Sequence, residues 1–228
     1  NDTTMTRTWV DSYPYKANST FALHPMFLRL SELGTLADAD RQAYYDSLGR
    51  ELNALKEIDY ERVNNGKMEF AREIFAQEGK KVMSSKEFKD FVIQNEYWLK
   101  PYAAFCVLRD KFDTPDYTKW GEYADYDAEK VERLVCDNVY EINFVYYLQF
   151  NLDKQMHAAK NYANSKGVAL KGDIPIGISR TSVDAWLNPR LFNLDCQAGA
   201  PPDDFSVLGQ NWGLPTYNWE EMSRDGFA

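Results

Sequence analysis

Histidine and cysteine are scarce in this sequence, which argues against metal and disulfide chemistry. Only His24 and His157 are present, with no H-x-x-x-H pair and no His/Cys cluster at the spacing of a zinc site. The cysteines, Cys106, Cys136 and Cys196, are odd in number and form no C-x-x-C. Cys106 and Cys136 fall in apolar helical patterns, so we expect reduced core residues of a cytoplasmic protein that needs no metal and no cofactor.

Long apolar runs and an excess of positive charge are also lacking. No apolar run reaches about 18 residues, and the start NDTTMTRTW has no charged segment before an apolar core, so neither a transmembrane helix nor a signal peptide is indicated. Lys plus Arg total 26 against 35 Asp plus Glu, a net charge of −9. This balance argues against nucleic acid or an anionic membrane as a partner.

Aromatic residues are abundant, with 15 Tyr, 13 Phe and 6 Trp in a chain of 228 residues that is 44% hydrophobic. Such a chain can bury a substantial core and suggests one or two domains. Sugar rings stack their C–H faces on aromatic rings while carboxylates and amides bind the hydroxyls, so this composition suits a carbohydrate ligand. Aromatic rings also fill ordinary cores, and composition leaves both interpretations open.

Helical spacing of apolar residues dominates the middle of the chain. After a loop and a short strand at 27–30, we expect four helices before residue 113 and a fifth beyond it. The first helix is expected to begin at the possible capping box Thr35-Leu-Ala-Asp38, and the second to span 58–82. The third should begin at the capping box Ser84-Ser-Lys-Glu87, and the fourth should span 97–112. The fifth should run from an Asp127 cap to about Asn164 and be deeply buried over 139–152.

The segment 168–178 alternates like a strand with one apolar face. The apolar residues of one parity are Val168, Leu170, Ile174, Ile176 and Ile178. Asp173 has the other parity, and Pro175 cannot donate a ladder hydrogen bond, so the carboxylate should lie near the end of the strand. A helix before the strand and a loop after it are typical of an α/β repeat, whose catalytic groups cluster there. By residue type alone, a cap or a salt bridge within a turn is the favoured interpretation of Asp173.

Three separated motifs together resemble a known enzyme family. They are DSYPYKANSTFALHP at 11–25, KGDIPIGISRTSVDAW at 171–186 and AGAPPDDFSVLGQNWGLPTYNW at 198–219. In this order they resemble the 4-α-glucanotransferases, the amylomaltases or disproportionating enzymes of glycoside hydrolase family 77. The intervening YERVNNGKMEFAREIF and NEYWLKPYAAF resemble the family's inserted helical subdomain. The DSYPY form with ALHP resembles the branch found in plant cytosol and in some bacteria.

The resemblance implies an α/β fold, here a fragment of a (β/α)8 TIM barrel that is mostly α by residue count. It implies a barrel loop and short strand with the DSYPY motif at 1–34 and an inserted helical subdomain at 35–126. Residues 127–228 would hold a helix, barrel strand three and the active-site loop region. The open edge of the strand at 168–174 is expected to pair with another copy of the chain or to rearrange locally.

The resemblance also implies an activity, the transfer of α-1,4-glucan segments between maltooligosaccharides in starch and maltose metabolism. Tyr15 resembles the tyrosine that stacks on the donor sugar. Asp173 resembles the aspartate that ends barrel strand three, and Gln210 and Trp212 resemble acceptor-side sugar contacts. Without the motifs, Tyr15 and Trp212 would be interpreted as packing residues.

The segment GAPPDDFS, Gly199 to Ser206, resembles the flexible loop that covers the bound glucan. Pro201 and Pro202 stiffen this loop, which suits a lid that excludes water. The candidate residues in it are Asp203, expected to bind substrate, and Gly199, Pro201, Pro202, Asp204 and Phe205. Without the motif, Asp203 and Asp204 would be interpreted as a solvated turn.

A retaining double displacement needs two carboxyl groups about 5–5.5 Å apart, one nucleophile and one acid/base. In the family both belong to later motifs, R-x-D and E-D, which these 228 residues do not reach. We therefore expect this chain to bind glucan without catalysing transfer alone. The alternatives are a non-catalytic glucan-binding or helical scaffold segment and a helical protein-interaction module.

Overall fold

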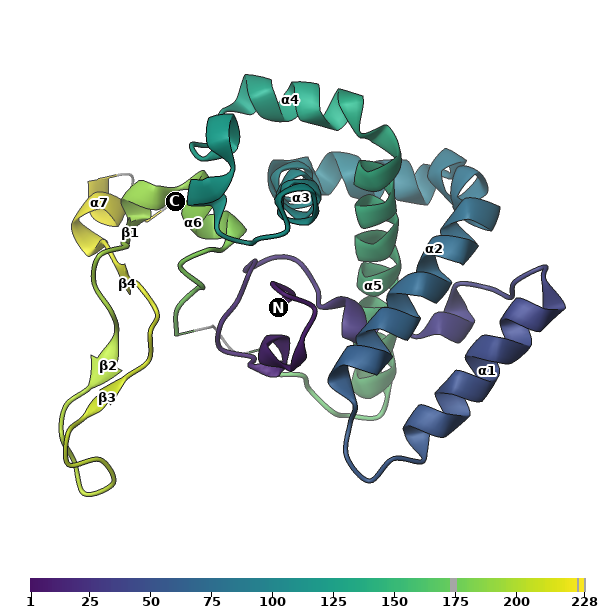
Figure 1. Ribbon diagram of the computed structural model, residues 1–228, viewed down its shortest axis with the longest axis horizontal. Helices are drawn as coiled ribbons and strands as arrows, with labels where there is room; N and C mark the ends of the chain where they lie inside the picture. The colour runs from purple at the N-terminus through teal and green to yellow at the C-terminus, as the bar shows by residue number, and fades with distance from the viewer. Residues whose placement is uncertain (173–175, 225, 228) are drawn as a thin grey trace.

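Three long helices form the centre of the protein in this computed structural model, which describes residues 1–172, 176–224 and 226–227. They are α2 (Tyr60–Ser84), α3 (Lys86–Phe112) and α5 (Val139–Ser165). The contact between α3 and α5 is the most extensive, and α2 packs against both (Figure 1). The helices α1 (Ala39–Asn53) and α4 (Ala128–Asp137) lie outside this centre, α1 against α2 and α4 across α3 and α5.

Short polar side chains begin four of these helices, close to the predicted positions. Asp38 accepts hydrogen bonds from the first turn of α1, three residues beyond the predicted Thr35. Ser85 rather than Ser84 caps α3. Asp59 caps α2, and Asp127 caps α4 as expected. Each cap satisfies backbone N–H groups that have no partner within the helix.

Two helix boundaries differ from the prediction. The predicted third and fourth helices are one helix, α3, which continues through Pro101 because both flanking turns bury apolar residues, including Leu99 and Phe105. The predicted helix from Asp127 to Asn164 divides at Asn138, whose backbone is not helical and whose side chain donates to the carbonyl of Leu134. That local bond competes with continuation of the helix.

Aromatic side chains hold the linker between α3 and α4 in the core. Trp120 and Trp186 are fully buried and meet edge to face, with ring centroids 5.7 Å apart. The indole of Trp120 donates to the carbonyl of Thr114, and that of Trp186 donates to the carbonyl of Tyr123. These contacts fix α6 (Val183–Leu187) against α3, so the segment after residue 176 is attached to the helical centre.

The C-terminal part holds two small antiparallel pairs (Figure 1). One pairs β1 (Phe192–Asn193) with β4 (Thr216–Tyr217), next to α7 (Trp219–Arg224). The other pairs β2 (Gly199–Ala200) with β3 (Gln210–Asn211). The β2–β3 hairpin extends away from the helices as an arm. Six short 3-10 turns complete the described elements: Trp9–Ser12, Pro25–Phe27, Leu30–Glu32, Tyr117–Lys119, Gly121–Tyr123 and Pro189–Leu191.

The predicted strand at 168–178 does not form in the part that the structure describes. Residues 168–172 are irregular, and Val168 and Leu170 are about half exposed. Ile178 alone pairs, in an isolated parallel bridge with Ala17, and it is buried. A strand of a parallel sheet is stabilised by partners along its whole length, and this segment has one. Asp173 lies outside the described residues.

Two smaller expectations were also wrong. Residues 27–30 form no strand, because the 3-10 turns Pro25–Phe27 and Leu30–Glu32 take most of this segment. Cys106 is buried as predicted, but Cys136 is exposed, since α4 turns Val131 and Leu134 inward. Within the described ranges, no helix combines the length and apolar character needed to cross a membrane.

Candidate functional site

The DSYPY turn is held from beneath by its first residue. Asp11 is 3% exposed, and its carboxylate accepts hydrogen bonds from the backbone N–H groups of Met5, Thr6 and Arg7. The Thr6 hydroxyl adds another at 3.2 Å. Arg7 adopts the left-handed conformation, with φ of 59°, and this bend helps successive N–H groups to converge on one anion. The turn is therefore fixed from its buried side.

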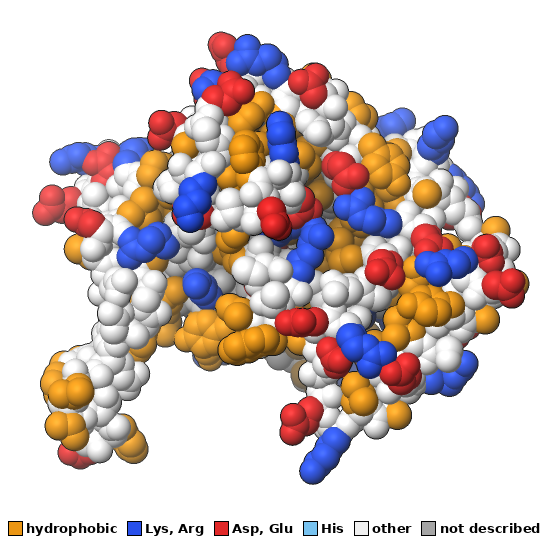
Figure 2. All heavy atoms as spheres, in the orientation of Figure 1, with side chains coloured by type: hydrophobic (Ala, Val, Ile, Leu, Met, Phe, Trp, Pro, Cys, Tyr) orange, Lys and Arg blue, Asp and Glu red, His pale blue; other side chains and the backbone are white. Residues whose placement is uncertain are grey.

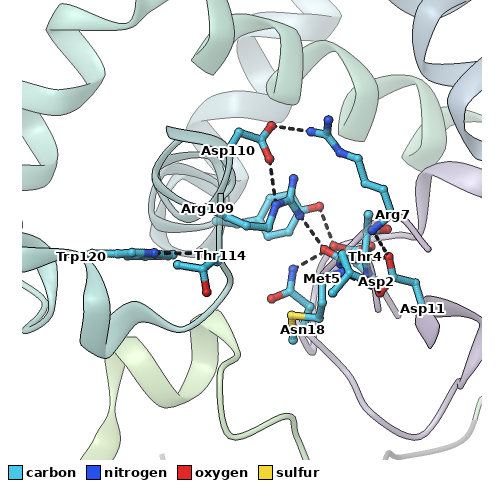
Figure 3. Close-up of polar contacts among 12 residues, drawn as sticks. Asp2, Thr4, Met5, Arg7, Asp11, Asn18, Arg109, Asp110, Thr114 and Trp120 are labelled. Carbon is cyan, nitrogen blue, oxygen red and sulfur yellow. Dashed lines mark hydrogen bonds and ion pairs between the residues drawn. The ribbon is translucent and has the colours of Figure 1, made fainter. Parts of the chain in front are cut away.

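A second buried carboxylate ties the same segment to α3. The Asp2 carboxylate accepts hydrogen bonds from the Tyr102 hydroxyl at 2.8 Å, from the Asn18 amide at 3.1 Å and from the Thr4 backbone at 3.0 Å (Figure 3). Burial raises the pKa of Tyr102 well above its ordinary value, so its hydroxyl stays a donor. Asp2 thus fixes the residues on both sides of the turn to one helix.

Arg109 completes this anchoring from α3. Its guanidinium donates to the carbonyl of Thr4 and, through Nε, to Asp110 at 2.9 Å. Asp110 also forms an ion pair with Arg7, as Figure 3 shows. The N-terminal segment is consequently bound to α3 by charged groups on both sides of Thr4.

Above these anchors, the two tyrosines of the motif face outward. Tyr13 and Tyr15 are 48% and 49% exposed, and their rings meet edge to face with centroids 5.7 Å apart. A half-exposed aromatic ring on a rigid turn is the arrangement that stacking against a sugar requires, because little conformational entropy is lost on binding.

The second motif lies directly beside the first. The parallel bridge joins Ala17 to Ile178, and the Ser179 N–H donates to the carbonyl of Ala17 at 2.8 Å. Farther on, the backbone N–H and hydroxyl of Thr20 both donate to the carboxylate of Asp184 at 3.0 Å. Burial raises the pKa of Asp184, and the Thr20 bonds oppose that rise. The segments that follow Tyr15 and Asp173 in sequence are therefore neighbours in space.

The third motif is attached to the second at the base of the hairpin. Leu214 is buried against Gly177, where an added Cβ would come within 3.1 Å of the Leu214 side chain. The Leu214 carbonyl accepts a hydrogen bond from the N–H of Ala198. The Arg180 guanidinium donates to the carbonyl of Cys196 at 3.0 Å. All three motifs thus meet around the Ala17–Ile178 bridge.

The hairpin brings Gln210 and Trp212 together. The indole N–H of Trp212 donates to the side-chain oxygen of Gln210 at 3.0 Å. The backbone N–H of Trp212 donates to the carbonyl of Ala198 at 2.9 Å. Trp212 keeps more than a third of its surface exposed. Among the described residues no hydrogen bond or ring contact joins Tyr15 to Gln210 or Trp212, and the turn and the hairpin are linked through their bases.

The tip of the hairpin carries the remaining candidates. The Asp203 carboxylate accepts from the backbone N–H groups of Phe205 and Ser206, at 3.0 and 2.7 Å, and so shapes the tip. Pro201, Pro202 and Asp204 are exposed beside it. Phe205 is 96% exposed, and Val207 and Leu208 are nearly as open, which gives the arm the apolar end visible at lower left in Figure 2.

Gly199 allows the two strands of this hairpin to pair closely. A Cβ at Gly199 would lie 2.0 Å from the carbonyl oxygen of Gln210. We expect Gly199→Ala to push β2 and β3 apart and to increase the rate of proteolysis between residues 199 and 211 several-fold. The matched control is Gly49→Ala in α1, where an added Cβ meets nothing within 4 Å and should stabilise the helix by about 1 kcal/mol. Equal cleavage of Gly199→Ala and the parent would contradict this expectation.

His24, at the end of the first motif, has a structural position. Its Nε2 lies 2.6 Å from the Tyr60 hydroxyl, and its Nδ1 accepts from the N–H of Met26 at 3.0 Å. Burial lowers the pKa of this imidazole below its ordinary 6.5, although the Asp2 and Asp11 carboxylates act in the opposite direction. The neutral ring is therefore the form that suits the folded protein.

This lowered pKa predicts a pH dependence of stability. Below about pH 6.5 the unfolded chain binds a proton at His24 that the folded chain resists, so the free energy of unfolding should fall with decreasing pH. Above that pH the contribution is constant. We expect His24→Asn, which retains an acceptor near the position of Nδ1 but does not titrate, to flatten the melting temperature between about pH 5.5 and 7. A variant profile as steep as that of the parent would exclude His24 as the cause.

Sequence reasoning found the three motifs but not the groups that anchor them. Asp2, Asp11 and Arg109 received no role, although Asp11 is the first letter of DSYPY. The only signal was that position, because an aspartate before a turn is ordinarily solvated. Its burial depends on N–H groups four to six residues earlier in the chain.

Comparison with protein families gives a match along almost the whole chain. The model of glycoside hydrolase family 77, described as 4-alpha-glucanotransferase, matches residues 2–228. The 4-alpha-glucanotransferase DPE2 of Oryza sativa subsp. japonica is 46% identical over 100% of this chain and 24% of its own length. The 4-alpha-glucanotransferase of Chlamydia muridarum is 32% identical over 95% of this chain and 41% of its own.

Solved structures give a consistent result. The amylomaltase from Streptococcus agalactiae in complex with acarbose is similar with a TM-score of 0.76 and 25% identity, over 94% of this chain and 44% of that one. The amylomaltase from Corynebacterium glutamicum has a TM-score of 0.67 at 20% identity, over 94% and 29%. The chain thus spans less than half the length of each of these relatives and structures.

Proposed function

Because this chain belongs to glycoside hydrolase family 77, the 4-alpha-glucanotransferases, we propose that its protein transfers α-1,4-glucan segments between maltooligosaccharides in starch and maltose metabolism. The observation that carries this proposal is the meeting of the three motifs around the Ala17–Ile178 bridge. Residues that are up to 200 positions apart then present one outward-facing turn and one projecting hairpin on a shared base.

The proposed roles follow from how each residue is presented. Tyr15 stacks on the donor sugar, since its ring is half exposed on a turn fixed by Asp11. Gln210 and Trp212 hold the acceptor, with the indole oriented by its bond to the amide. Asp173, which resembles the aspartate that ends barrel strand three, is proposed to bind substrate on the basis of its motif alone.

The hairpin is proposed to close over the glucan. Its exposed tip, with Pro201, Pro202, Asp204 and Phe205, stands on a base where Gly199 allows close pairing. Asp203 then binds substrate through oxygen lone pairs that the turn leaves available, while its N–H acceptor bonds shape the tip. Closure would exclude water, so that a sugar hydroxyl rather than water accepts the glycosyl group.

The reaction is proposed to retain anomeric configuration in two displacements. A carboxylate displaces the leaving sugar and forms a glycosyl ester while an acid donates a proton to the departing oxygen. The acceptor 4-hydroxyl then attacks, returns its proton to the same group and releases the carboxylate. We place both carboxyl groups outside these 228 residues, so this part of the protein binds and covers the glucan.

The fold that this function implies is a fragment of a (β/α)8 barrel. In it, the Ala17–Ile178 bridge is a contact between neighbouring barrel strands. Residues 1–34 and 127–228 supply the barrel part, and 35–126 the inserted helical subdomain. The exposed Val168 and Leu170 would meet further barrel strands or another copy of the chain. The free cysteines suit a cytoplasmic location.

Disproportionation of maltotriose by the full-length protein tests the proposal. Transfer of a maltosyl unit would yield glucose and maltopentaose, and transfer of a glucosyl unit would yield maltose and maltotetraose, whereas hydrolysis would yield only glucose and maltose. Maltooligosaccharide binding without any product would favour a glucan-binding segment, and no binding would contradict the proposal. For the isolated 228 residues we expect no disproportionation, and turnover by them would show that the carboxyl groups are present here.

A further inference from the structure

A cavity of about 360 Å³ lies where α2, α3, α5 and the N-terminal segment meet, and residues 11–15 of the DSYPY turn are not among its lining residues. Side chains one helical turn apart line it from each helix, with Asn64, Met68 and Arg72 on α2. Leu148 and Phe144 of α5 supply apolar wall. Its volume is at the small end of the range of about 300–1,000 Å³ for ligand sites, which suits one sugar ring and not a glucan chain.

Asn64, in the lining of this cavity, has a buried side-chain amide with no hydrogen bond to any described residue. Its side chain is 1% exposed, and among the described residues neither its Oδ1 nor its Nδ2 has a hydrogen-bond partner. An unsatisfied buried amide is costly, and native proteins rarely leave one without a partner. The amide can donate through Nδ2 and accept through Oδ1 at one place, which matches a pair of sugar hydroxyls.

The cavity is also cationic in an acidic protein. Its lining holds Arg7, Arg72, Arg109 and Lys111 against two carboxylates, Asp110 and Glu141, which is four positive charges less two negative, or +2. The whole chain has a net charge of −9. Asp110 serves two guanidiniums, those of Arg7 and Arg109, while Arg72 pairs with Glu141 at 2.9 Å. Guanidiniums that share too few carboxylates favour a phosphate group.

From these observations we propose that the cavity binds a hexose monophosphate, with its phosphate at the guanidiniums and its hydroxyls at the Asn64 amide. The apolar walls of Met68 and Phe144 would cover a C–H face of the ring. The proposal does not depend on glucan transfer, because the site shares none of the proposed glucan contacts.

Binding of a ligand in this cavity would also stabilise the DSYPY turn. Arg7 and Thr4 line the cavity, and the Arg7 N–H is one of the groups that hold the Asp11 carboxylate. A phosphate that pairs with Arg7 would stabilise this segment in the conformation that presents Tyr15. Bound ligand is therefore expected to slow hydrogen exchange in residues 4–11 as well as in α2.

Calorimetric titration of the full-length protein with glucose 6-phosphate and glucose 1-phosphate tests the proposal, with inorganic phosphate and glucose as separate probes. We expect a hexose phosphate to bind at least tenfold more tightly than inorganic phosphate and glucose to bind not at all. Equal affinity for inorganic phosphate and the hexose phosphates would overturn the sugar part of the proposal. No binding of any phosphate would overturn all of it.

Variants distinguish this cavity from other binding sites. Asn64→Leu replaces the unpaired amide with an apolar side chain of similar size, so the fold should persist while affinity falls at least tenfold. Arg72→Met should weaken binding as strongly, whereas Lys81→Met, which removes an exposed cation from the same helix, should not. Undiminished affinity in both Asn64→Leu and Arg72→Met would place the ligand elsewhere and contradict the proposal.

Discussion

Replacing Asp11 by alanine is expected to lower the free energy of unfolding of the N-terminal segment by about 3–5 kcal/mol. The change removes a carboxylate that is 3% exposed and leaves the N–H groups of Met5, Thr6 and Arg7 without their acceptor. Hydrogen bonds to charged groups contribute about 1.5–3 kcal/mol each, and water offsets their loss only in part, because Met5 is buried although Thr6 is exposed. Urea unfolding of the variant and the parent measures the difference.

Two further variants make the Asp11 result interpretable. Asp11→Asn keeps one carbonyl oxygen but turns an amide donor toward backbone N–H groups, so its stability should lie between parent and alanine variant. Asp125→Ala, at an exposed loop position, should change stability by no more than about 0.5 kcal/mol. If Asp11→Ala unfolds at the same urea concentration as the parent, the carboxylate does not hold the turn.

Replacing Tyr15 by alanine is expected to reduce glucan transfer by about 10- to 100-fold, which corresponds to about 1.4–2.8 kcal/mol of lost stabilisation. The melting temperature should hardly change, because the ring is half exposed and, among the described residues, its ring contact is with Tyr13. Initial rates of maltotriose disproportionation by the full-length protein measure the loss.

Tyr15→Phe is the matched control, since it keeps the aromatic face and removes only the hydroxyl. Its transfer rate should stay within a few-fold of the parent. A phenylalanine variant as slow as the alanine variant would show that the hydroxyl and not the stacking face matters. An alanine variant with the same transfer rate as the parent would show that Tyr15 does not contribute to the glucan site.

The helices were predictable because their signals are local. Apolar spacing and short capping side chains place α1 and α2 and the outer ends of the other long helices within a few residues, and Asp127 caps α4 as expected. The errors came from tertiary context. Pro101 is tolerated because the surrounding turns of α3 are buried, and Asn138 divides two helices by bonding to Leu134. Neither outcome follows from the propensity of the residue itself.

The prediction of a strand at 168–178 was wrong for a similar reason. Alternation shows that a segment could have one apolar face, but burial of that face requires neighbouring strands, and only Ile178 has one in the described part. The same limit applies to the anchors. Tyr102 is 100 residues from Asp2, and no sequence pattern connects them. Motif resemblance supplied the candidate residues, whereas the convergence of the three motifs and the buried carboxylates became visible only in the structure.

Hydrogen exchange of the full-length protein with and without maltoheptaose tests most directly whether the first and third motifs belong to one glucan site. Slower exchange on binding is expected in residues 11–20 and 198–212 together, with α1 unchanged as an internal reference. Protection confined to one of these two segments, or found in α1 and in neither of them, would contradict the account.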